Sequence, residues 1–230
     1  MLRNLANIDR EPQPRSKVAA VENPMVPALP PGPSGPLVQS DHIALSKEAV
    51  RKAALDARKA FVRTLSDARR ARLEQKLAEH LTSICAGATV VGGFAPLGSE
   101  ISPLLAMEEA RAVGRIVAFP AFDNPAKPFK FRAGDPLQPG PFGIMQPKRS
   151  APVVEPDLIL VPLIAIDGRG TRLGRGKGHY DRALIGLRKG GARLIGVGWA
   201  LQRLADTIPA NEWDVPLDAF ASPDGVEEFG

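Results

Sequence analysis

The sequence predicts an α/β fold: a three-layer domain with a mostly parallel central sheet and helices on both faces. Three observations support this prediction. The chain of 230 residues has 44% hydrophobic and 24% charged residues, which is typical of globular proteins. Short apolar runs alternate along it with segments of helical spacing, an order that favours parallel strands. The most apolar run, residues 158–161, is short and bounded by prolines, as a fully buried strand would be.

The first half of the chain is expected to form three helices and three strands. Serine is a favoured N-cap residue, and Ser46, Ser66 and Ser99 each precede a segment with helical spacing of its side chains. Apolar runs that end in proline indicate the strands. The expected helices cover residues 47–61, 66–81 and 99–112, and the expected strands cover residues 89–95, 115–119 and 129–131.

The second half is expected to begin with a long loop, because residues 136–156 are polar and interrupted by prolines. The buried strand at 158–161 follows, and then a glycine-rich loop. A helix is expected at 180–189, with further strands at 193–197 and 219–221. These last elements complete the alternation of strand and helix.

The proline content separates an N-terminal extension from the domain. Eight of the 23 prolines fall within residues 1–46, and proline blocks both helix and sheet. We therefore predict a proline-rich disordered extension over residues 1–45 and a single α/β domain over residues 46–230. A partner that binds proline-rich segments is an alternative role for the extension.

Composition excludes several classes of protein. No apolar run approaches the roughly 20 residues of a membrane span. The single cysteine, Cys85, cannot form an internal disulfide or a zinc site built from cysteines, which suits a reducing compartment. The first residues resemble neither a secretory signal nor a transit peptide. A cytoplasmic location is the expectation.

The net charge of +5 is moderate, but its position is informative. Residues 1–46 hold four bases and four acids, so the whole surplus lies in residues 47–230. Part of it is concentrated between Arg169 and Arg182. Such a positive region attracts nucleotides, phosphates or nucleic acid.

The glycine-rich segment at 167–181 decides among these anions. Glycines at every second position, 174, 176 and 178, allow positive φ angles and a close approach of the backbone to a ligand. Arg172, Arg175 and Lys177 add charge, and the N-terminus of the following helix adds its dipole. The segment therefore predicts a phosphate-binding loop. It matches neither a Walker A loop nor a dinucleotide fingerprint.

The segment from strand 158–161 to Asp181 resembles the signature of the 5-formyltetrahydrofolate cyclo-ligase (methenyltetrahydrofolate synthetase) family. That signature is RLG-x-G-x-G-Y-Y-D, following a strand that ends in proline. The resemblance extends over about residues 47–221. Weaker matches flank the signature; they include Lys47 and Arg51, Phe94 with Glu100-Ile101, Pro120, Phe142-Gly143-Ile144 with Pro147, and Asp214 with Asp218.

The resemblance implies a set of ATP-binding residues and a set of folate-binding residues. The ATP-binding set would be Lys47, Arg51, Arg172, Leu173, Gly174, Arg175, Gly176, Lys177, Gly178, His179 and Tyr180. The substrate-binding set would be Ala95, Glu100, Arg175, Gly176, Lys177, Gly178 and His179, with Glu100 anchoring the pterin.

The implied reaction is the cyclisation of 5-formyltetrahydrofolate to 5,10-methenyltetrahydrofolate, dependent on ATP and Mg²⁺, with release of ADP and phosphate. Arg175 and Lys177 are the expected catalytic residues, and Asp181 and Asp214 the expected magnesium ligands. His179 stands where the family has a tyrosine. The expected partners are 5-formyltetrahydrofolate and ATP, without nucleic acid or membrane, and the expected state is a monomer or weak dimer.

The residues by themselves leave two alternatives open. One is a basic protein that binds nucleic acid or phosphate through residues 169–193, although only 5% of the residues are aromatic. The other is a sugar-phosphate sensor or isomerase on a similar sheet, because fold does not fix function.

Overall fold

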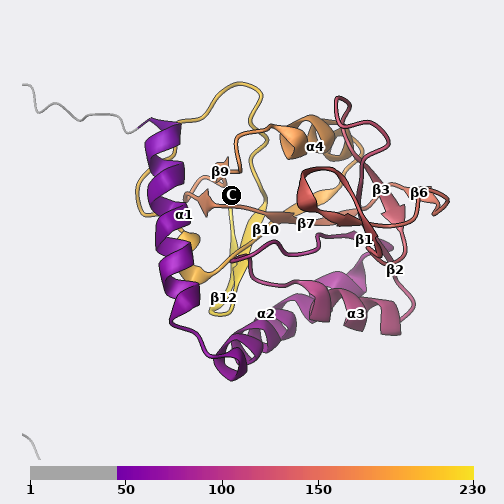
Figure 1. The fold of residues 1–230 in the computed structure, drawn as a ribbon, viewed down its shortest axis with the longest axis horizontal. Helices are drawn as coiled ribbons and strands as arrows, with labels where there is room; N and C mark the ends of the chain where they lie inside the picture. The colour runs from indigo at the N-terminus through magenta and orange to yellow at the C-terminus, as the bar shows by residue number, and fades with distance from the viewer. Residues whose placement is uncertain (1–45) are drawn as a thin grey trace, which may run out of the picture. The chain divides into compact units, whose positions relative to one another are not determined.

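The structure of the protein is a computed structural model that describes residues 46–230. The predicted disordered extension over residues 1–45 lies outside the described residues. Within the described part, eight strands form one central sheet (Figure 1). They are β1 (Val90–Gly92), β2 (Ile116–Ala121), β3 (Lys130–Ala133), β6 (Val153–Val154), β7 (Leu158–Pro162), β10 (Arg193–Val197), β11 (Ala219–Ser222) and β12 (Gly225–Glu228).

The order of the strands is β12-β11-β10-β7-β1-β2-β3-β6. The five strands from β11 to β2 are parallel to one another, and the antiparallel strands β12, β3 and β6 lie at the two edges. Strand β7 lies in the middle, and Leu158 to Val161 are buried. The predicted α/β fold with a mostly parallel sheet is therefore confirmed.

Helices cover both faces of the sheet, as Figure 1 shows. The four α-helices of the described residues are α1 (Lys47–Arg63), α2 (Asp67–Gly87), α3 (Leu104–Ala112) and α4 (His179–Lys189). Helices α2 and α3 cover one face, and α4 covers the other. Because successive strand residues point to opposite faces, Leu158 and Leu160 of β7 pack in the cluster that includes α2 and α3. Ile159 and Val161 pack in the second cluster, with Leu184 of α4.

Helix α1 lies at the carboxyl end of β7 instead of covering a face. Its Arg58 is almost fully buried and donates a hydrogen bond of 3.0 Å to the carbonyl of Leu163, just beyond β7. Val50 and Ala54 pack against the small hairpin formed by β8 (Ala165–Ile166) and β9 (Arg172–Leu173). The sequence predicted this helix but not its place at the end of β7.

The expected helix start at Ser99 is wrong, because α3 begins only at Leu104. Proline disfavours a helical conformation of the residue before it and is tolerated at a helix start, and Pro103 is the N-cap of α3. Residues 96–103 therefore form a loop. Glu100 lies on that loop, where its carboxylate accepts a hydrogen bond of 2.8 Å from the amide of Leu97.

The expected loop at 136–156 contains short elements that the sequence did not indicate. They are β4 (Gln138–Pro139), a 3-10 turn (Pro141–Gly143), β5 (Met145–Gln146) and the edge strand β6. The edge strand β12 was also missed, and the glycine-rich stretch begins with the β8–β9 hairpin. No helix in the described part of the chain is both long and apolar enough to cross a membrane.

Candidate active site

A pocket of about 800 Å³ lies at the carboxyl end of the parallel strands. Ligands of open α/β sheets bind at this position. All the residues that the sequence singled out for ATP, folate, catalysis and metal line this one pocket. They come from segments that are far apart in the chain: the start of α1, the loop after β1, the glycine-rich loop, the start of α4, and residues 211–214. The structure brings the predicted residues together, while their individual roles stay predictions.

The glycine-rich loop has the backbone geometry that its sequence predicted. Gly176 and Gly178 have φ angles of +85° and +63°, a region that favours glycine. Gly178 is also the N-cap of α4, and no side chain there accepts a hydrogen bond from the first amides of the helix. Those amides and the helix dipole are therefore available to an anion in the pocket.

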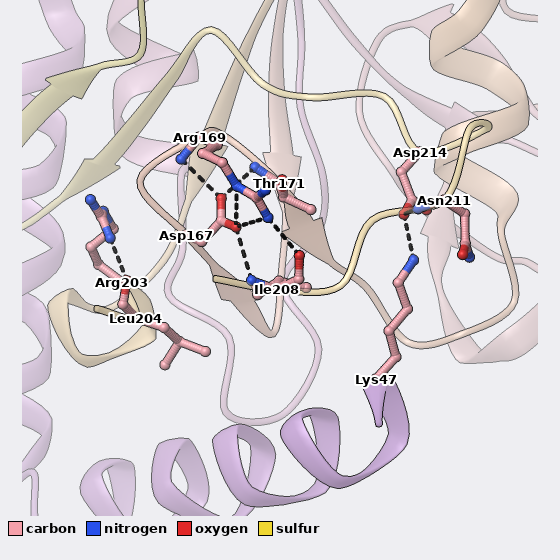
Figure 2. A network of polar contacts seen from close by, with 9 residues as sticks. All are labelled: Lys47, Asp167, Arg169, Thr171, Arg203, Leu204, Ile208, Asn211 and Asp214. Carbon is pink, nitrogen blue, oxygen red and sulfur yellow. Dashed lines mark hydrogen bonds and ion pairs between the residues drawn. The ribbon is translucent and has the colours of Figure 1, made fainter. Parts of the chain in front are cut away.

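One end of the pocket is polar and charged; we call it the charged end and define it by Lys47, Arg51, Gly174, Asn211 and Asp214. Lys47 forms an ion pair with Asp214, and Arg51 donates a hydrogen bond of 2.9 Å to the carbonyl of Gly174. The Asp214 carboxylate also accepts a hydrogen bond of 2.7 Å from the amide of Asn211. Figure 2 shows Lys47 reaching from the end of α1 to Asp214. The start of α1 is thus tied to both of the segments beside it.

A buried carboxylate outside the pocket fixes the base of the charged end. Asp167 accepts hydrogen bonds of 2.9 Å from the amides of Arg169, Thr171 and Ile208, and the Arg169 guanidinium bridges the same carboxylate to the carbonyl of Ile208 (Figure 2). These contacts join the turn that begins the glycine-rich loop to the segment that leads to Asp214.

The hydrogen bonds also set the charge state of Asp167. Burial by itself would raise the pKa of this carboxyl group. The amides of Ile208 and Arg169, the Arg169 guanidinium and the amide of Thr171 outweigh burial and hold the pKa below its usual value. The Asp167 carboxylate is therefore ionised at neutral pH. Asp167 belongs to the glycine-rich segment, but its sequence position did not indicate this role.

A second part of the lining is made of rings; we call it the aromatic end and define it by Phe122, Phe129, Phe142, His179 and Tyr180. The rings pack in edge-on or tilted pairs. The centroid distances are 4.5 Å for Phe142–His179, 4.9 Å for Phe129–Tyr180, 5.2 Å for Phe122–His179 and 5.4 Å for Phe122–Phe142. Phe142 adopts a left-handed conformation with φ of +62°, which is costly for a residue other than glycine. The packing of the Phe142 ring against Phe122 and His179 compensates for the cost of this backbone conformation.

Glu100 places a carboxylate in the same pocket. Arg175 donates a hydrogen bond of 3.0 Å to one of its oxygens, and the Leu97 amide binds the other. Beneath this loop the buried Arg58 donates to the hydroxyl of Ser99 at 3.0 Å. Burial lowers the pKa of the Arg58 guanidinium while the Glu100 charge raises it, but an arginine stays protonated in proteins. The Glu100 loop is therefore held from below by a cation that the sequence analysis did not identify.

His179 is neutral in this environment. An arginine can only donate, so Nδ1 of His179, at 3.0 Å from the Arg182 guanidinium, accepts a hydrogen bond and the ring proton is on Nε2. Burial, Arg182 and Lys177 all lower the pKa of the imidazole. The residue that replaces the family tyrosine thus resembles it at neutral pH, as a flat ring without charge.

Two basic residues of the glycine-rich loop contact the aromatic end. The ammonium of Lys177 lies 4.4 Å from the centroid of the Phe142 ring, a cation–π distance. Arg172 forms an ion pair with Asp181, and its guanidinium lies 5.8 Å from the centroid of the Tyr180 ring. A phosphate bound near Lys177 would therefore lie next to a ligand that packs against these rings.

Asp181 and Asp214 are the candidate metal ligands. Each forms an ion pair with a basic side chain, Asp181 with Arg172 and Asp214 with Lys47. Among residues 46–230, no three His, Cys, Asp or Glu side chains are grouped closely enough to hold a metal ion. Mg²⁺ commonly uses one or two carboxylates together with water and substrate phosphates. Both carboxylates line the pocket, and their oxygens are of the type that Mg²⁺ prefers.

The chain is similar to proteins of one known family. A family model described as the 5-formyltetrahydrofolate cyclo-ligase family matches residues 44–223. A 5-formyltetrahydrofolate cyclo-ligase of Mycolicibacterium smegmatis is 31% identical over 77% of this chain and 94% of its own length. One from Haemophilus influenzae is 36% identical over 36% of this chain, and the match spans only 46% of that relative.

The solved structures give the same result for the fold. The NMR structure of a 5,10-methenyltetrahydrofolate synthetase from Aquifex aeolicus superposes with a TM-score of 0.67 and 27% identity. The alignment covers 79% of this chain and 92% of that protein. The similarity of the fold therefore extends over most of the chain.

Proposed function

The chain belongs to the 5-formyltetrahydrofolate cyclo-ligase family, and we propose that it catalyses the ATP-dependent cyclisation of 5-formyltetrahydrofolate to 5,10-methenyltetrahydrofolate. The observation that carries the proposal is the division of one pocket into a charged end and an aromatic end. The phosphates of a nucleoside triphosphate need the charged end, and a pterin ring needs the aromatic end. Neither nucleic-acid binding nor sugar-phosphate binding explains why one pocket is lined both by charged groups and by a set of packed rings.

The proposed reaction has two steps. The formyl oxygen at N5 of the folate attacks the γ-phosphorus of ATP, and the bond to ADP breaks. N10 then attacks the activated formyl carbon, its proton is lost, and phosphate leaves as the five-membered ring closes. Phosphoryl transfer depends mainly on positioning and on electrostatic stabilisation.

The charged groups of the pocket match the first step. Lys177 and Arg175 both line the pocket and would stabilise the charge on the transferred phosphoryl group. Lys47, Arg51 and the amides at the start of α4 would hold the remaining phosphates. Mg²⁺ bound by Asp181 and Asp214 would neutralise phosphate charge during the transfer.

The aromatic end matches the second substrate. The Glu100 carboxylate can accept two parallel N–H bonds from the aminopyrimidinone edge of a pterin. Burial raises the pKa of Tyr180, so its hydroxyl stays protonated and can donate a hydrogen bond. Neutral His179 can pack against the flat ring system without adding charge.

The test is the near-UV absorbance of the methenyl product. Protein mixed with 5-formyltetrahydrofolate and MgATP should give a rise that is absent without ATP and is lost in Asp181→Ala. The exposed Lys189→Ala, at the far end of α4, is the matched control and should retain activity. Folded wild-type protein that gives no rise would overturn the proposal.

A further inference from the structure

Trp213 is a large aromatic side chain that remains exposed inside the pocket. It lines the cavity and is 64% exposed, whereas the other tryptophan, Trp199, is 1% exposed and donates its indole N–H to the Ser99 carbonyl. A tryptophan with most of its surface in water is uncommon in a folded protein, because the ring has a large apolar area. Such a ring on a pocket wall is suited to cover a flat ligand.

The position of Trp213 is at the charged end. It precedes Asp214, which is paired with Lys47, and it follows Asn211, whose amide is bound by the Asp214 carboxylate. In the described part of the chain, the rings of the aromatic end pack with one another, and no ring pair includes Trp213. The charged end thus has an aromatic surface of its own, separate from the rings next to Glu100.

The backbone around Trp213 is held in place before any ligand arrives. Asp167 and Arg169 fix Ile208 on one side, and the Lys47–Asp214 pair fixes the other (Figure 2). A contact surface that is already ordered loses less conformational entropy on binding. The exposed ring is therefore presented by a constrained segment.

We propose that Trp213 is the platform on which the adenine ring of ATP stacks, an inference that rests on the proposed function. The phosphates would lie on the glycine-rich loop beside Lys47 and Arg51, and the base would then cover the indole. A purine has a flat π face, and stacking of a base on an aromatic side chain is favourable for every base. The pterin is assigned to the other end, where Glu100 and five rings are available.

The first test uses tryptophan fluorescence of the full chain. Trp199→Phe leaves Trp213 as the only tryptophan. Excited at 295 nm, this variant should change its emission with MgATP and become less accessible to acrylamide. Inorganic tripolyphosphate with Mg²⁺ should leave both properties unchanged, since it has no base. An unchanged Trp213 signal would overturn the inference when equilibrium dialysis shows ATP bound, and so would a signal that responds equally to tripolyphosphate.

The second test separates the two substrates. Trp213→Ala should raise the KM for ATP about tenfold, while the KM for 5-formyltetrahydrofolate stays within a factor of two. Trp213→Phe, which keeps a flat ring, should recover most of the ATP affinity. Affinity for tripolyphosphate should be the same in all three proteins. A rise in the folate KM instead of the ATP KM would overturn the assignment.

The outcomes distinguish this inference from the function on which it rests. Methenyl formation with an ATP KM unchanged by Trp213→Ala would overturn the role of Trp213 and leave the enzyme activity intact. Failure of the wild-type chain to bind ATP by dialysis, together with no methenyl formation, would overturn both.

Discussion

The charged end and the aromatic end of the pocket are stabilised in different ways. The charged end joins the start of α1, the glycine-rich loop and residues 208–214 through ion pairs and hydrogen bonds that depend on the buried Asp167. The aromatic end joins the end of β2, the β4–β5 hairpin and the start of α4 through ring packing, with a strained residue at its tip. Changes of charge should therefore affect one end, and changes of shape the other.

The largest effect is expected on kcat when Lys177 is replaced. Lys177→Ala removes the cation that lies over Phe142 and lines the pocket, and kcat should fall by about 10²–10³-fold, as for the loss of one preorganised group that stabilises a transition state. Initial rates of methenyl formation at saturating substrates measure it. A kcat within threefold of wild type would show that Lys177 does not serve the transferred phosphoryl group.

The next effect is on stability and tests the anchor of the charged end. Asp167→Asn places an amide NH₂ group among hydrogen-bond donors, and the free energy of unfolding at pH 7 should fall by about 2–3 kcal/mol. Because the folded-state pKa of Asp167 lies below its unfolded value of about 3.9, its contribution is present above that pH and is lost as the pH falls toward the folded pKa.

Urea unfolding from neutral pH down to about pH 3 should therefore show the wild-type and Asp167→Asn curves converging in acid. The control is Asp56→Asn, since Asp56 forms an exposed i,i+4 pair with Lys52 on α1. That variant should stay within about 0.5 kcal/mol of wild type. A constant difference at all pH values would contradict the assigned charge on Asp167.

A smaller effect separates the substrates at the aromatic end. Glu100→Gln removes a charged acceptor that Arg175 and the Leu97 amide bind, and the KM for 5-formyltetrahydrofolate should rise about tenfold. The KM for ATP should change by less than twofold. Steady-state kinetics with each substrate varied in turn gives both values. A larger change for ATP would assign Glu100 to the charged end.

The smallest effect concerns the strained ring. Phe142→Gly removes contacts with His179 and Phe122, but glycine accepts the positive φ angle without cost. The two effects should nearly cancel in stability, to within about 1 kcal/mol, and the folate KM should rise only a few-fold. A thermal melt and the same kinetics measure this. A loss of several kcal/mol in the free energy of unfolding would mean that the Phe142 ring stabilises the fold as a whole and not only the pocket.

The sequence predicted those parts of the molecule that depend on local pattern. The buried strand at 158–161 and the strand at 193–197 were predicted almost at their observed limits, and the helices after Ser46 and Ser66 begin within one residue of the predicted start. The second of these helices continues six residues beyond its predicted end, to Gly87. Glycines 176 and 178 indicated positive φ angles, and both have them. These features follow from one short stretch of chain each.

The features that the sequence did not show depend on contacts between distant segments. Nothing in the sequence near Arg58 indicates that its side chain is buried beneath the loop of Glu100, which lies 42 residues further along the chain. Asp167 binds Ile208, and Trp213 enters the pocket only because that segment returns to the start of α1. The helix start at Ser99 failed for a local reason, since Pro103 displaced it to Leu104.

The division of the pocket into two ends is tested most directly by hydrogen exchange of the backbone amides. MgATP alone should protect residues 208–214, and 5-formyltetrahydrofolate alone should protect residues 142–146. The glycine-rich loop should respond to both ligands. Protection of residues 142–146 by MgATP and of residues 208–214 by the folate would contradict the assignment of the two ends.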